Sequence, residues 1–125
     1  CCRDASSNLN GTSNNIYIET ILNSSTSNCN NSPTINALPI PYYRVGNPVI
    51  HNLGVYEPDG DSLHYSLINA KTSNTTTASY QSGYSGVLPI SGINLDGYTG
   101  EITFTPTIIG NFVVTILITR MVLKK

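Results

Sequence analysis

The chain has 125 residues and a formal net charge of −1, with six basic and seven acidic residues. Only 10% of the residues are charged, whereas there are 15 Asn, 14 Ser and 14 Thr. The length excludes a large multidomain enzyme, and six bases against seven acids argue against binding to a nucleic acid backbone. A surface that owes its polarity to Asn, Ser and Thr favours an extracellular protein.

Residues 1–36 are rich in Asn, Ser and Thr and contain one strand candidate, residues 16–22, which is dominated by β-branched and aromatic side chains. Four prolines then follow within sixteen residues, at positions 33, 39, 41 and 48. Proline fixes φ and lacks an N–H, so this stretch cannot form a continuous helix. We predict that residues 1–32 end a preceding β-domain and that residues 33–41 form a Pro-rich linker.

From residue 42 onward, short apolar stretches alternate with Gly, Pro, Asn and Asp, and none has a helical period. This pattern predicts strands at residues 49–55, 63–69, 79–84, 86–89, 101–106 and 111–119. The alternation is clearest at 101–105, where Ile102 and Phe104 are expected to point inward. The longest apolar run, residues 112–118, is far shorter than the roughly 20 residues of a membrane span. The sequence therefore predicts an all-β sandwich over residues 42–120, with 121–125 starting the next linker.

Three segments carry a resemblance to a known family. They are residues 57–67 (EPDGDSLHYSL), 92–107 (GINLDGYTGEITFTPT) and 110–115 (GNFVVT). Together they resemble the cadherin-like, dystroglycan-type immunoglobulin-fold repeats of bacterial surface proteins, over roughly residues 40–119. The residues CCRD at 1–4, YIE at 17–19 and CNNSP at 29–33 are also similar to large secreted adhesins of gliding Bacteroidota.

This resemblance implies a non-catalytic repeat module that extends and displays a surface adhesin or filament. Its partners would be neighbouring repeats of the same polypeptide, with surface polysaccharide as a further possibility. No G-x-S-x-G motif accompanies His51 and His64, so we do not expect hydrolase activity.

The three cysteines cannot all pair within one chain. Cys1 and Cys2 are adjacent and would face opposite sides of a strand, so only one of them can readily meet Cys29. We adopt Cys2–Cys29 as the predicted disulfide. The remaining thiol is either an intermodule link or a buried free cysteine whose partner lies elsewhere.

Calcium is the predicted cofactor. Glu57, Asp59 and Asp61 alternate, and in an extended segment their side chains would share one side, about 7 Å apart. In the family that the chain resembles, such a turn often supplies calcium ligands, and Asp96 in a second turn is a further candidate. The alternative is a solvated acidic turn, because exposed carboxylates at this spacing repel only weakly in water. The last strand offers Arg120 where such repeats usually place another acid.

Carbohydrate binding is the alternative function. Tyr80, Tyr84 and Tyr98 lie in or beside expected loops, where aromatic rings can stack on sugars. Tyrosine is also a common filler at sandwich edges, and the chain contains no Trp.

Overall fold

A computed structural model describes residues 5–11, 15–22, 31–37 and 42–121 of the chain. Within these ranges the regular structure consists of strands, with no helix. The seven strands are β1 (Thr34–Ile35), β2 (Val49–Asn52), β3 (Val55–Tyr56), β4 (Ser62–Leu67), β5 (Asn94–Leu95), β6 (Glu101–Phe104) and β7 (Ile116–Met121). The prediction of an all-β protein is therefore confirmed.

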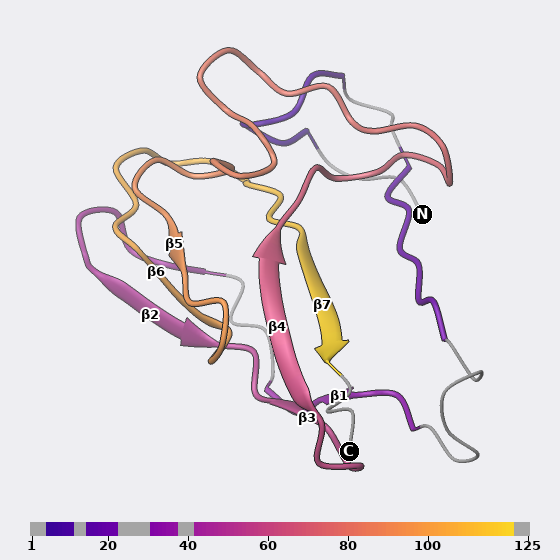
Figure 1. Ribbon diagram of the computed structural model, residues 1–125. Helices are drawn as coiled ribbons and strands as arrows, with labels where there is room; N and C mark the ends of the chain where they lie inside the picture. The colour runs from indigo at the N-terminus through magenta and orange to yellow at the C-terminus, as the bar shows by residue number, and fades with distance from the viewer. Residues whose placement is uncertain (1–4, 12–14, 23–30, 38–41, 122–125) are drawn as a thin grey trace.

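The strands form three antiparallel sheets, and in the view of Figure 1 β2, β6 and β5 lie to the left of the β4-β7 pair, with β1 and β3 below it. β1 pairs with β3, β6 lies between β2 and β5, and β4 pairs with β7 along six residues of each strand. The sheets are joined by further contacts, since the Tyr65 N–H on β4 donates to the Gly97 carbonyl of the β5–β6 turn at 2.8 Å.

The strand predicted at residues 49–55 is divided between two sheets. Gly54 adopts a positive φ of 58°, a conformation that glycine reaches without a steric cost. The Gly54 N–H also bonds to the Asn52 side chain at 2.8 Å, which closes a local turn. The chain thereby leaves the β2-β6-β5 sheet and pairs with β1, whose residues lie in the predicted linker.

Three predicted strands are wrong. Residues 16–22 contribute one isolated bridge, Tyr17 to Lys71. Residues 79–84 contribute one isolated bridge, Leu9 to Tyr80, and residues 86–89 contribute none. Gly83 turns the chain with a φ of 88°, and Pro89 has no N–H to donate to a ladder. The strand predicted at 111–119 begins only at Ile116 and continues to Met121.

Two fully buried side chains of the described chain, those of Asn8 and Leu9, lie in the amino-terminal segment. Leu9 is 1% exposed and packs with Ala70 and Ala78, against which Tyr80 and Val113 also pack. Asn8 is fully buried beside it. Segments that are far apart in sequence are therefore joined by residues that we predicted to end a preceding domain; that boundary stays a prediction.

A second apolar region lies between the β2-β6-β5 sheet and residues 106–116. It borders a partly open cavity of about 810 Å³, lined mostly by aliphatic and aromatic side chains, among them Ile102, Phe104 and Phe112. Ile102 is buried. Phe104 is half-buried, and its ring packs edge-to-face with the ring of Tyr43, with 5.4 Å between the ring centroids. These two residues point inward as the alternation of residues 101–105 predicts.

Candidate functional site

The acidic segment at residues 57–61 forms the turn between β3 and β4. The Gly60 N–H donates to the Glu57 carbonyl at 3.4 Å, so Pro58 and Asp59 are the central residues of a β-turn. Proline favours the first central position, and Gly60 adopts a positive φ of 79°. The segment is thus folded back on itself, so the spacing expected for carboxylates of an extended segment does not apply to it.

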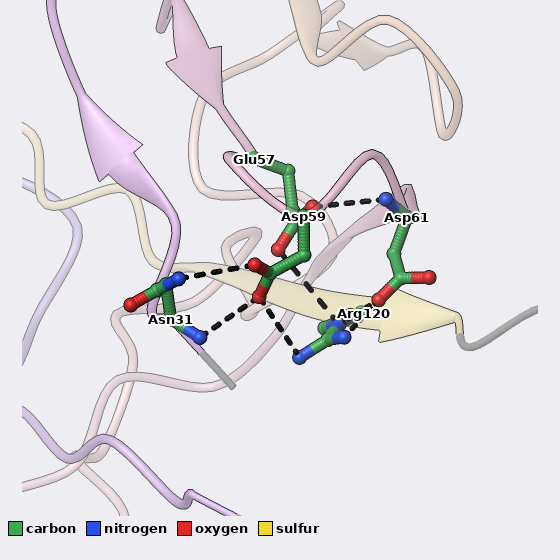
Figure 2. A network of polar contacts seen from close by, with 5 residues as sticks. All are labelled: Asn31, Glu57, Asp59, Asp61 and Arg120. Atoms are coloured by element: carbon green, nitrogen blue, oxygen red, sulfur yellow. Dashed lines mark hydrogen bonds and ion pairs between the residues drawn. The ribbon is translucent and has the colours of Figure 1, made fainter. Parts of the chain in front are cut away.

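All three carboxylates of this turn face the guanidinium of Arg120, as Figure 2 shows. Arg120 Nε donates a hydrogen bond to Asp61 Oδ2, and Nη2 forms an ion pair with the same oxygen. Nε lies 3.8 Å from Glu57 Oε1, and Nη1 lies 3.8 Å from Asp59 Oδ2. The pairing of Leu63 with Arg120 between β4 and β7 brings this base to the turn.

The cluster is largely shielded from solvent. The side chain of Glu57 is 4% exposed, that of Asp61 15% and that of Arg120 16%. Glu57 Oε2 accepts a hydrogen bond from the Asp61 N–H at 2.9 Å, whereas Oε1 is buried and accepts none. The 3.8 Å approach of the guanidinium therefore compensates the buried charge at Oε1 without a hydrogen bond.

Asn31 joins the cluster from the amino-terminal side. Its backbone N–H donates to Asp59 Oδ2 at 2.8 Å and its side-chain amide donates to Oδ1 at 3.0 Å, as drawn in Figure 2. These bonds, with a smaller contribution from Arg120, hold the pKa of Asp59 below its ordinary value of 3.8. We call Asn31, Glu57, Asp59, Asp61 and Arg120 the clasp.

Asp96 lies in a different turn, between β5 and β6. Its Oδ1 accepts hydrogen bonds from the N–H groups of Tyr98 at 2.8 Å and Thr99 at 2.9 Å. The bonds from Thr99 and Tyr98 lower the pKa of Asp96. The carboxylate thus stabilises its own turn, and no contact joins it to the clasp in the described chain.

The lowered pKa values predict acid sensitivity. For Asp59 and Asp96, a folded-state pKa below the unfolded value gives stability that is present above pH 3.8 and is lost as the pH falls through the folded value. Asp96→Asn keeps an oxygen acceptor and removes the charge. We expect the urea midpoint of this variant to lie below that of the wild type at pH 6, and the gap to close below about pH 4. A gap that stays constant down to pH 2.5 would contradict the role of the Asp96 charge.

The four predicted calcium ligands do not form one site. In the described ranges, no group of three or more His, Cys, Asp or Glu side chains is arranged to hold a metal ion. Glu57, Asp59 and Asp61 converge, but on a guanidinium rather than on an open centre. The residues therefore do not fit a calcium ion while Arg120 lies among them.

The three tyrosines of the carbohydrate alternative lie in separate surroundings. The Tyr80 hydroxyl accepts a hydrogen bond from the Ala70 N–H at 2.9 Å, and the Tyr84 ring packs against Phe112 at 5.9 Å. Only Tyr98 is well exposed, at 78%, with its ring edge against His64. No two of these rings form a shared exposed surface, so the arrangement gives the sugar hypothesis no support.

The predicted disulfide residues, Cys2 and Cys29, and the alternative partner Cys1 lie outside the described residues. Asn31 and Asn8 are the functional and structural residues that the sequence interpretation missed. Both stand in the Asn-rich amino-terminal part, where nothing local distinguishes them from their neighbours.

Comparison with known proteins gives no relative: no family model, no curated protein and no solved structure matches the chain. No helix in the described parts of the chain is long and apolar enough to cross a membrane. The function must therefore be argued from the fold and from the clasp.

Proposed function

We propose that the chain is a non-catalytic, extracellular repeat module of a bacterial surface adhesin or filament, with an immunoglobulin- or cadherin-like sandwich fold. The module extends the polypeptide and displays neighbouring repeats. The observation that carries this proposal is the clasp, because it ties the segment before β1 to the turn between β3 and β4 and to the last strand, β7.

The end of β7 is the point at which tension would open the fold. β7 pairs with β4 so that Met121 lies opposite Ser62, which places the last residue of β7 beside the first residue of β4. A pull on the chain beyond Met121 would separate this antiparallel pair from its open end, one residue pair at a time. Arg120 lies directly before Met121, so its contacts with the 57–61 turn must break before the ladder can open beyond the first residue pair.

The clasp also restrains the entering chain. Asn31 precedes β1 and binds Asp59 through two hydrogen bonds, and Asp59 Oδ2, which accepts one of them, also lies 3.8 Å from Arg120 Nη1. A force applied at Asn31 and Met121 is therefore transmitted across the turn before it reaches the sheets. This arrangement suits a module that bears load.

Contacts between the sheets support the sandwich. Tyr65 of β4 is 5% exposed, and its ring lies against Gly100, the residue before β6. The β4-β7 pair and the β2-β6-β5 sheet thus pack through a shared aromatic side chain, which is the arrangement expected between two layers.

The proposal is tested by stretching the module between reference domains in a single-molecule force experiment. We expect a cooperative unfolding event that releases at least about 300 Å of chain, the extended length of residues 31–121. Asp59→Ala, which removes the acceptor for Asn31, should unfold at a lower force. Glu101→Ala, which removes an exposed carboxylate outside the clasp, is the matched control. Extension without a force peak would contradict a load-bearing role.

A further inference from the structure

We propose that Arg120 is the resident cation of the 57–61 turn. Its guanidinium occupies the position between three carboxylates that a divalent cation would need, which makes the fold independent of calcium. This inference opposes the calcium site that the sequence predicts, and it concerns the turn whether or not the module bears load.

The geometry places one cationic group at the centre of the turn. Each nitrogen of the Arg120 guanidinium approaches a carboxylate: Nη2 and Nε approach Asp61, Nε also approaches Glu57, and Nη1 approaches Asp59. The planar fork of arginine can serve several carboxylates at once, which the compact ammonium of lysine does less well. One side chain therefore joins all three acids.

Burial explains why a cation is required. The Glu57 side chain is only 4% exposed, and no donor forms a hydrogen bond with its Oε1. A buried carboxylate without a compensating charge is strongly destabilising, and Arg120 Nε at 3.8 Å supplies that charge. The three acids and one base leave a net charge of −2 in the clasp, and the two N–H donors of Asn31 stabilise the Asp59 carboxylate within it.

A calcium ion cannot share this position with the guanidinium. Calcium takes six to eight oxygen ligands at about 2.3–2.6 Å, so the three carboxylates would have to close on the ion. The positive charge of the ion would then repel the Arg120 guanidinium and expel it from the turn, although the Arg120 side chain is now only 16% exposed. Binding of calcium would therefore break the contacts of β7 with the turn.

The test compares the wild type with Arg120→Gln, and Arg44→Gln serves as the control because it removes an exposed arginine outside the clasp. Melting temperatures are measured with 10 mM calcium chloride and with chelator. We expect calcium to shift the wild type and Arg44→Gln by less than about 1 °C. Arg120→Gln should melt about 5–10 °C lower in chelator, and calcium should restore about 5 °C by binding the vacated carboxylates.

Arg120→Lys keeps the positive charge and serves if the glutamine variant fails to fold. We expect it to melt between the wild type and the glutamine variant in chelator and to gain less from calcium. Stabilisation of the wild type by several degrees in calcium would overturn the proposal. A position-120 variant that is as stable as Arg44→Gln in chelator, or Arg120→Gln that folds but does not respond to calcium, would overturn it as well.

Discussion

Asn8→Ala is expected to lower the free energy of unfolding by about 3–5 kcal/mol, although it alters one of 15 asparagines. The Asn8 side chain is fully buried and connects two distant segments. Its amide donates to the carbonyls of Pro89 at 3.0 Å and Val113 at 2.8 Å, and its oxygen accepts from the Val113 N–H at 3.0 Å. Alanine would leave these three backbone groups without partners in a buried region.

The measurement is urea unfolding at neutral pH, with Asn74→Ala as the control. Asn74 lies exposed in the loop between Lys71 and Thr77, so its replacement should change stability by less than about 0.5 kcal/mol. A loss below about 1 kcal/mol for Asn8→Ala would show that residues 5–11 are not integral to the fold. A loss of the expected size would place the start of the folded unit before Asn8 and revise the predicted boundary at residues 33–41.

Strands with a clear alternation are predictable from the sequence because their pattern is local. Ile102 and Phe104 alternate with polar neighbours, and β6 is found where the pattern predicts it. β4 likewise matches its prediction to within two residues. In each case the side chains that define the strand lie within the strand itself.

Residues 111–115 show the limit of that reasoning. Their apolar content predicts the start of a strand, yet their hydrogen bonds go to separate partners. The Asn111 carbonyl accepts from the Ser7 N–H, Val113 bonds to the Asn8 side chain, and the Thr115 carbonyl accepts from the Ile68 N–H. Partners 47 to 105 residues away along the chain decide whether this stretch joins a ladder, and no local pattern reports them.

The acidic turn is predictable from the sequence, but its cation is not. Pro58 and Gly60 predict a turn, and the sequence places the three acids within it. That Arg120 lies at its centre depends on the register of β7 against β4, which sets Arg120 opposite Leu63. A shift of one residue would carry Arg120 to the other face of the strand, so charge at this site is decided by strand pairing.

Gly100→Ala is expected to cost about 3 kcal/mol, because it combines an unfavourable backbone conformation with a clash in the core. Gly100 is buried and has a φ of 71°. A Cβ at this position would lie 2.7 Å from Cε1 and 2.9 Å from Cζ of the buried Tyr65 ring. The ring links the β4-β7 pair to the β5–β6 turn and has little room to move.

Gly92→Ala separates the two contributions. Gly92 has nearly the same φ, 73°, but a Cβ there would meet no atom within 4 Å. We therefore expect it to cost only about 1 kcal/mol, the penalty of the left-handed conformation alone. The difference between the two variants in the loss of unfolding free energy, measured by urea unfolding, is the energetic cost of the clash with Tyr65.

Tyr65→Leu provides the final comparison, because leucine lacks the two ring atoms nearest to the added methyl group. In the double variant, the cost of Gly100→Ala should fall by about 1–2 kcal/mol relative to its cost in the wild type. Purely additive losses would mean that the Tyr65 ring does not pack on Gly100. The side-chain contact that supports a two-layer sandwich would then be lost, and the backbone bond from Tyr65 to Gly97 would remain as a link between the β4-β7 pair and the three-stranded sheet.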